Sequence, residues 1–272
     1  MFPTRIVCLT EETTETLYSL GEGDRVVGIS GYTVRPARAR REKPRVSAFL
    51  SARTEKVVEL KPDLVIGFSD LQADIARDLT KRGLNVLIFN QRSVQEILDM
   101  ILALSSLVGA AEKGAQLIQE LERGLEQIRE SAKAFPRRPR VYFEEWDEPM
   151  ISGIRWVSEL VEIAGGEDIF SALSHSQAAS GRVVADPALA IQKNPELILA
   201  SWCGKKFRPE RLAARPGWQN IAAVKNNELH EIKSADILQP GPAALTDGVR
   251  QIHEILKRSL DRGSGTREQA AG

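Results

Sequence analysis

The sequence has few cysteines, no long apolar run and no secretory leader pattern. Cys8 and Cys203 lie far apart and form no CxxC or CxxxC pair, which argues against a disulfide framework or a structural zinc site. No apolar stretch reaches the roughly 20 residues that a membrane-spanning helix needs. The N-terminus lacks the extended apolar region of a secretory signal. These absences predict a cytoplasmic protein without membrane insertion, or a periplasmic one if a signal has been removed.

An excess of one charge and the common enzyme motifs are missing as well. Lys+Arg and Asp+Glu both number 37, whereas nucleic-acid binders usually carry a basic excess. The chain contains no GxGxxG after a strand, no P-loop, no GxSxG and no HExxH. Its three histidines have no partner pattern that would suggest a catalytic triad. We therefore expect a monomeric binding protein for a small molecule, with no catalytic cofactor and no nucleic-acid partner.

Short β-branched runs alternate with helical patterns along most of the chain, which is typical of parallel α/β units. Segments 33–45 and 171–182 are rich in Arg and Pro or in small polar residues, and both are predicted to be loops. The predicted strands are Arg5–Leu9, Arg25–Ser30, Asp63–Gly67, Asn85–Phe89, Arg140–Phe143, Leu197–Ala200 and Leu229–Ile232.

One element differs from this alternation. Apolar residues recur at helical spacing from Ala111 to Ala132 with no strand following, and Pro136 and Pro139 end the pattern. On either side, VVELKPDLVIG (57–67) resembles AIQKNPELILA (190–200), a weak internal repeat. We predict an α/β fold with two parallel-sheet lobes, at 1–109 and 137–262, joined by one long backbone helix at 110–136. The last residues, 263–272, are predicted to be disordered.

Aromatic residues follow the predicted strands, where open parallel sheets bind their ligands. The chain has 8 Phe, 3 Tyr and 4 Trp in all, so five at strand exits is a biased placement. Aromatic walls suit a large, flat and partly apolar ligand such as a tetrapyrrole-like ring, although each residue can instead fill a core. The five residues are Tyr32, Phe49, Phe68, Trp146 and Trp202.

Polar side chains at the same exits can bond the rim of such a ligand, or can simply face water. The acids from Glu144 to Glu148 can bind a cation or amide groups, or form a solvated loop. His175 can ligate cobalt or iron through a neutral imidazole, although a lone loop histidine is more often uninvolved. The rim candidates are Glu12, Asn90, Gln91, Ser234, Asp236 and Gln239.

In order along the chain, several stretches resemble class III substrate-binding proteins of ABC importers. They are TEETTETLYSLG, VVGISGYTVRP, RVSAFLSARTEKVVELKPDLVIG, SELVEIAGGEDIF, ARPGWQNIAAVKNNELHEI and GPAALTDGV. The resemblance covers about residues 5–260. Members of this family bind vitamin B12, ferric siderophores or haem, and the B12- and siderophore-binding members are the most similar. The family implies two lobes, a long connecting helix, a shallow cleft between the lobes and a small closure on binding.

The resemblance also implies roles for individual positions. Tyr32, Phe49 and Phe68 match corrinoid-contacting aromatic positions, and Asp236 and Gln239 fall in a loop that touches ligand in B12-binding members. Arg182 stands where those members have a further aromatic residue. For docking to the permease, Glu55 matches the acid of the first lobe. The second docking position is Ala188, with Asp186 nearby.

Three functions follow from these residues. The first is binding of a cobalamin-like corrinoid in the cleft between the lobes, linked to ABC-type uptake or cytosolic handling. The second is binding of a ferric siderophore or haem, for which Arg35, Arg38 and Arg182 can pair with an anionic chelate. The third, of another class, is a cytosolic tetrapyrrole- or corrinoid-processing enzyme, which would need His175 and the acids at 144–148 near the metal.

Overall fold

Two units, each built on its own β-sheet, make up the chain. The structure is a computed structural model that describes residues 2–270, with side chains described up to Arg262. Unit 1 contains the residues up to Gln91, then Gln95–Glu122 and Gln239–Ala243. Unit 2 contains Arg92–Val94, Arg123–Leu238 and the residues from Ala244 onward.

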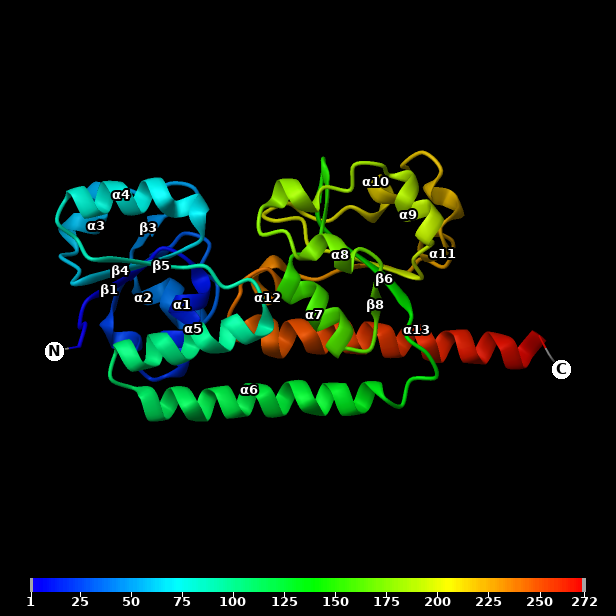
Figure 1. Cartoon of the computed structure of the whole chain (residues 1–272), viewed down its shortest axis with the longest axis horizontal. Coiled ribbons are helices and arrows are strands. Elements are labelled where there is room, and N and C mark those ends of the chain that lie inside the picture. The colour runs from blue at the N-terminus through cyan, green and yellow to red at the C-terminus, as the bar shows by residue number, and fades with distance from the viewer. Residues whose placement is uncertain (1, 271–272) are drawn as a thin grey trace. The chain divides into compact units, whose positions relative to one another are not determined.

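The sheet of unit 1 is entirely parallel, with strand order β3-β2-β1-β4-β5. Helices α3 and α4 cover one face of this sheet, and α1 and α5 cover the other (Figure 1). The strands are β1 (Ile6–Cys8), β2 (Val26–Ser30), β3 (Arg45–Ser47), β4 (Leu64–Phe68) and β5 (Val86–Phe89). The helices are α1 (Glu11–Ser19), α2 (Ala37–Glu42), α3 (Thr54–Glu59), α4 (Ala73–Lys81) and α5 (Val94–Leu107).

The order of these strands follows from their composition. Strands β1, β2 and β4 read IVC, VVGIS and LVIGF, and such continuous apolar runs suit strands buried on both faces. Their side chains join Leu9, Val46 and Leu79 in the core of the unit. The chain builds outward from β1 first through β2 to β3, and then on the other side through β4 to β5. The strand order therefore reverses between β1 and β4, the position where open α/β sheets form a crevice for ligands.

Helix α6 (Ala111–Ala132) has the bounds that its apolar spacing predicts. Its first half, to Glu122, belongs to unit 1, and its second half, from Arg123, belongs to unit 2. Within unit 2, Ser131 of this helix bonds Nε2 of His253 at 2.9 Å. The ring of Phe135, just beyond the helix, stacks on His253 with centroids 5.1 Å apart.

The sheet of unit 2 is mixed. Strands β10, β9, β6 and β8 are parallel, and β7 runs antiparallel to the end of β6. The strands are β6 (Arg140–Asp147), β7 (Met150–Ser152), β8 (Glu167–Asp168), β9 (Leu197–Ala200) and β10 (Leu229–Glu231). The helices are α7 (Arg155–Ile163), α8 (Ser171–Ser174), α9 (Ala188–Lys193), α10 (Pro209–Ala213), α11 (Ala222–Lys225), α12 (Ser234–Ile237) and α13 (Val249–Ala270).

The α/β architecture with two sheets and a long helix at 111–132 is confirmed, while some local predictions are wrong. The second sheet was expected to be parallel but is mixed, because the chain turns back after β6 and pairs β7 with it antiparallel. The predicted loop at 33–45 contains α2, and the one at 171–182 contains α8 and a 3₁₀ turn. Residues 263–270 were expected to be disordered but continue helix α13, and residues 271–272 lie outside the described part. Among the described residues, no helix has the length and apolarity to cross a bilayer.

Candidate functional site

Exposed apolar side chains of unit 1 gather where its strands end. The described residues include seven large hydrophobic side chains that are exposed, and four of them follow β2, β3 or β4. Because the carboxyl ends of parallel strands lie along one edge of a sheet, these four residues share that edge. We call this surface the carboxyl-edge face. It consists of Tyr32 (54% exposed), Val34 (41%), Leu50 (69%) and Leu71 (57%).

Gln72 ties together two of the loops that carry this face. Its side-chain amide donates to the carbonyl oxygen of Phe49 at 2.9 Å, and its Oε1 accepts from the backbone N–H of Phe68 at 3.0 Å. Since β3 and β4 are separated by two strands, the loop after β3 reaches across the ends of β2 and β1. Phe49 is half-buried in this loop, and Phe68 is buried at 5% exposure. A Cβ at Gly67 would lie 2.5 Å from Gln72 Oε1, so a larger residue there would displace the Gln72 side chain.

Two buried carboxyl groups follow the end of β1, beside the point where the strand order reverses. Burial raises the pKa of Glu11 to about 7 and that of Glu12 to about 8. Thr10 donates its hydroxyl to Glu12 Oε1 at 2.6 Å, whereas the buried Oε2 has no hydrogen-bond partner among the described atoms. A carboxyl group that keeps its proton near neutral pH can donate a hydrogen bond to a ligand oxygen.

The segment after α12 packs against these acids within unit 1. A Cβ at Gly241 would lie 2.6 Å from the Cβ of Glu12, so the two backbones are in close contact. Gln91 donates from Nε2 to the carbonyl oxygen of Pro240 at 3.0 Å. Gln239 is half-buried in the same segment, and Asn90 is exposed at the end of β5. The structure thus brings Glu12, Gln91 and Gln239 into one neighbourhood at the strand ends.

In unit 2, Glu144 forms several contacts at the carboxyl ends of β6 and β9. This side chain is fully buried on β6 and forms an ion pair with Arg215. It also accepts from Trp202 Nε1 at 2.8 Å and from the Tyr142 hydroxyl at 3.0 Å. Burial raises the pKa of Glu144, and the hydrogen bonds and charge of Arg215 oppose that rise. Glu144 therefore acts as a buried structural anchor that joins the ends of β6 and β9.

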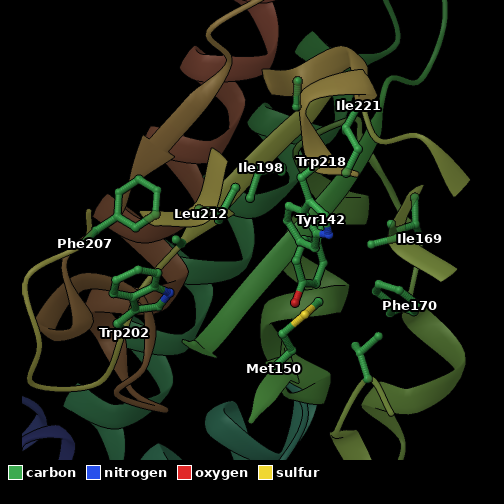
Figure 2. Packing of buried hydrophobic residues seen from close by; sticks show 14 residues of the cluster. Tyr142, Met150, Ile169, Phe170, Ile198, Trp202, Phe207, Leu212, Trp218 and Ile221 are labelled. Carbon is green, nitrogen blue, oxygen red and sulfur yellow. The ribbon is translucent and has the colours of Figure 1, made fainter. Parts of the chain in front are cut away.

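The two predicted tryptophan contacts have different environments. Trp202 is 2% exposed and belongs to the core cluster, where its ring meets Phe207 edge-on at 5.2 Å (Figure 2). Trp146 is half-buried, and the Nζ of Lys205 lies 3.7 Å from the centre of its ring. Figure 2 also shows Tyr142 and Trp218 within the same cluster. Of the two, Trp146 is the one with surface left for a ligand.

The acidic run at 144–148 is largely compensated by basic side chains. Arg182 is 2% exposed, forms a two-pronged ion pair with Glu145 and donates to the carbonyl oxygen of Ser152 at 2.7 Å. Asp147 pairs with Lys205 at 3.0 Å and with Arg211 at 3.6 Å. Arg182 therefore links β6 to β7 through its Nη1 and Nη2 atoms, which already bond protein groups, while its buried Nε has no hydrogen-bond partner among the described atoms.

The remaining polar candidates of unit 2 do not form a metal centre. His175 is exposed at the end of α8. No group of three or more His, Cys, Asp or Glu side chains is arranged to hold a metal ion in the described part of the chain. Asp236 accepts from Gln251 Nε2 at 3.1 Å, and Ser234 bonds the hydroxyl of Ser201 at 3.2 Å.

The candidate docking residues are both on the surface. Glu55 is the second residue of α3 and forms an exposed ion pair with Arg82 at 2.7 Å. Asp186 accepts from the backbone N–H of Ala188 at 2.9 Å, just before α9. Two arginines considered for an anionic chelate already have partners: Arg35 pairs with Glu15 and Arg38 pairs with Glu42.

Sequence reasoning missed Leu50, Leu71 and Gln72. An exposed leucine in a loop looks unremarkable in a sequence, because single apolar residues are common on surfaces. The signal available was position, since Leu50 directly follows Phe49 and Leu71 lies three residues after Phe68. Gln72 carried no such signal, because its importance depends on a partner 23 residues away.

Comparisons with known proteins agree with this architecture. A family model described as periplasmic binding protein matches residues 6–235. An uncharacterised ABC transporter substrate-binding lipoprotein of Bacillus subtilis, YvrC, is 27% identical over 93% of this chain and 80% of its own length. The vitamin B12-binding protein of Vibrio cholerae is 29% identical over 93% of this chain and 89% of its own. A periplasmic haem-binding protein from Pseudomonas aeruginosa has a similar fold, with a TM-score of 0.79 at 17% identity, covering 93% of this chain and 92% of that one.

Two expectations are decided by these findings. The expectation of a binding protein rather than an enzyme is confirmed, because the family and its matched members are substrate-binding proteins. The expectation of a cytoplasmic protein is wrong. The matched proteins are named as periplasmic proteins or as a substrate-binding lipoprotein, which points to a location outside the cytoplasm. The sequence argument failed because it inferred a compartment from the absence of a leader pattern.

Proposed function

Because the chain belongs to the periplasmic binding protein family, we propose that it binds a cobalamin-like corrinoid and delivers it to an ABC importer. The general role, binding a small molecule for an ABC transporter, is that of the family. The proposal adds the ligand and its position. In it, the corrin ring rests on the carboxyl-edge face of unit 1.

The observation that carries the proposal is the concentration of exposed apolar side chains at one edge of the first sheet. Tyr32, Leu50 and Leu71 are each more than half exposed and come from three different strand exits. Exposing such side chains together costs solvation free energy unless a partner covers them, and such patches commonly mark binding sites. A flat ring with apolar faces is a suitable partner, because it covers several of these side chains at once.

The two raised carboxyl pKa values support an amide-bearing ligand. Corrinoids carry amide side groups at the rim of the ring, and amides offer both carbonyl acceptors and N–H donors. Protonated Glu11 or Glu12 can donate to an amide carbonyl, and Asn90 can bond either end of the group. The vitamin B12-binding relative from Vibrio cholerae supports the same ligand class.

A haem or ferric chelate is the second candidate. It is supported by the haem-binding structural neighbour and by a groove with a positive charge excess that lies beside the carboxyl-edge face. For docking to the permease, we propose Glu55, which is exposed and can exchange its contact with Arg82 for a basic group of the partner.

A titration distinguishes these ligands. Cyanocobalamin, haemin and a ferric hydroxamate chelate are each added to the protein while the ligand absorbance and the tryptophan fluorescence are followed. We expect cyanocobalamin to bind with a Kd of about 1 µM or tighter. Tyr32→Ala should weaken binding by about tenfold, since an aromatic contact of this size is worth about 1 kcal/mol or more. Leu102→Ala, an exposed residue of α5, is the matched control.

The outcomes separate clearly. A Kd for cyanocobalamin weaker than about 10 µM, roughly −7 kcal/mol, contradicts the corrinoid proposal. If haemin or the ferric chelate then binds tightly and Tyr32→Ala weakens that binding, the second candidate replaces the first. If Tyr32→Ala and Leu102→Ala bind alike, the ligand does not use the carboxyl-edge face.

A further inference from the structure

A groove runs along the outer edge of the sheet in unit 1. It has a volume of about 850 Å³ and lies between the edge strand β3 and helix α3. The wall formed by β3 is fixed by backbone hydrogen bonds, from Ala48 N–H to the carbonyl oxygen of Ser51 at 2.7 Å and from Arg53 N–H to that of Val46 at 2.8 Å. The groove is therefore a preformed feature of the unit with a rigid wall.

The charged residues of this groove are mostly positive. Arg45, Arg53, Lys56 and Glu59 line it, and all four are exposed. The structure shows no ion pair or side-chain hydrogen bond for any of the four among the described residues. Most other arginines of the unit have such partners, for example Arg25, Arg77 and Arg82. A net excess of two positive charges thus faces one concave surface of a chain whose total charge is zero.

The groove adjoins the carboxyl-edge face. Gly31 and Ala48 line the groove, and the next residues along the chain are Tyr32 and Phe49, two of the proposed ring contacts. Gly31 N–H bonds the carbonyl oxygen of Ser47 at 2.7 Å, which holds these two strand exits together. A ligand that rests on Tyr32 can therefore extend a side group into the groove without crossing another element of the unit.

From this arrangement we infer that the ligand is a corrinoid that carries free carboxylate groups beside its amides, and that the groove binds the carboxylates while the ring lies on the carboxyl-edge face. The inference rests on the proposed function and narrows its ligand class. Arginine presents paired N–H donors that match a carboxylate, and lysine adds a compact charge. Because the three cations have no partner to give up among the described residues, the incoming carboxylates compete only with water. Glu59 at the same groove disfavours a carboxylate placed directly beside it.

Two corrins that differ only in their side groups provide the test. Dicyanocobyrinic acid carries free carboxylates, and dicyanocobinamide carries amides on the same ring. Both are titrated by absorbance into the natural protein and into the double variant Arg45→Gln/Arg53→Gln. The control is Arg123→Gln/Arg208→Gln, which removes the same charge from exposed positions outside the groove.

We expect the natural protein and the control to bind the acid about tenfold or more tightly than the amide at low salt. The groove variant should lose this preference while its affinity for the amide stays within about twofold, and added salt should reduce the preference in the natural protein. Equal affinity for the two corrins, or a preference that survives in the groove variant, overturns the inference and leaves the proposed function standing.

If the proposed function is wrong, neither corrin binds the natural protein, which differs from both outcomes above. Citrate then decides the inference by calorimetry, because it carries the carboxylates without the ring. Citrate binding that is lost in the groove variant and kept in the control supports the groove as a carboxylate site. Citrate that does not bind, or that binds both variants equally, overturns it.

Discussion

The side-chain amide of Gln72 donates a hydrogen bond to the carbonyl oxygen of Phe49 at 2.9 Å and thereby connects the exits of two non-adjacent strands. The same side chain accepts from the N–H of Phe68, so one buried residue holds both loops. The exposed side chains of Leu50 and Leu71 flank this connection in sequence. Gln72 is therefore a positioning residue for the carboxyl-edge face, which it supports from within the unit.

Replacing Gln72 with leucine should destabilise unit 1 and loosen the loop after β3. The change leaves the buried N–H of Phe68 without its acceptor, which costs about 1–3 kcal/mol. Amide hydrogen exchange across residues 47–54 should become faster, and ligand affinity should fall. Gln116→Leu, at an exposed position of α6, should change neither. Unchanged exchange in the 47–54 segment of Gln72→Leu would show that the loop is held by other contacts.

Glu12 should make unit 1 less stable as the pH rises. The carboxyl of a glutamate in water has a pKa of about 4.5, whereas burial raises the pKa of Glu12 in the folded chain to about 8. Between these values the unfolded chain binds fewer protons than the folded chain, so the free energy of unfolding decreases with increasing pH. Neighbouring Glu11 and Glu15 add to the effect, because their negative charges disfavour ionisation of Glu12. The decrease in the free energy of unfolding that Glu12 causes should be complete just above pH 8.

The variant Glu12→Gln isolates this contribution. It should be more stable than the natural protein at pH 8.5 by roughly 4–5 kcal/mol, and the difference should shrink towards pH 5. Far-UV circular dichroism and hydrogen exchange of residues 6–20 measure the effect in unit 1, because all four tryptophans lie in unit 2. Glu120→Gln, an exposed acid of α6, serves as the control. A stability difference that is the same at pH 5 and pH 8.5 would rule out titration of Glu12 as its cause.

The exposed leucines of the carboxyl-edge face offer a test that separates binding from stability. Leu50→Ser should weaken ligand binding by about fivefold or more, because the apolar area it offers to the ring is lost. The free energy of unfolding should change by less than about 0.5 kcal/mol, since the side chain is 69% exposed in the free protein. Leu102→Ser on α5 should leave both quantities unchanged. A loss of stability without a loss of affinity would place Leu50 in folding rather than in binding.

The sequence predicts those parts of the molecule that depend on local pattern. The apolar spacing from Ala111 to Ala132 sets the bounds of α6, and buried runs such as Leu197–Ala200 mark the strands. Short elements escaped prediction, because β8 has only two residues and is defined by its pairing with β6. Helix α2 was missed because its arginines and the flanking Pro36 and Pro44 resemble a loop, although alanine and arginine both favour helices.

The candidate site was less predictable, because contacts with residues far away in the sequence decide which of its side chains are buried and which are exposed. Trp202 follows a strand as expected, but its indole N–H points to Glu144, 58 residues away, and the ring is buried. Arg182 looked free to meet an anionic ligand, yet Glu145 already holds it. Neither pairing leaves a mark in the local sequence. Loop residues near strand ends can therefore be predicted as a group, whereas their division into core and surface needs the tertiary structure.

The ion pair of Glu144 and Arg215 gives a prediction for unit 2. Arg215→Met leaves the buried carboxyl of Glu144 without its counter-charge, which typically costs about 3–5 kcal/mol. Without the arginine, burial raises the pKa of Glu144 further, so the penalty should be larger at pH 8 than at pH 5, because a larger fraction of the carboxyl is protonated at the lower pH. Arg211→Met removes a more exposed contact to Asp147 at 3.6 Å and should cost less than about 1 kcal/mol.

Tryptophan fluorescence measures this prediction directly, because all four tryptophans lie in unit 2 and the guanidinium of Arg215 is 4.7 Å from the ring centre of Trp218. In urea titrations followed by fluorescence, the unfolding midpoint of Arg215→Met should be much lower at pH 8 than at pH 5. The midpoint of Arg211→Met should change with pH as that of the natural protein does. The double variant Glu144→Gln/Arg215→Met removes both charges and should recover much of the loss at pH 8, since no uncompensated carboxylate remains. If the double variant is as unstable as Arg215→Met at both pH values, packing of the arginine on Trp218 rather than its charge stabilises this end of the sheet.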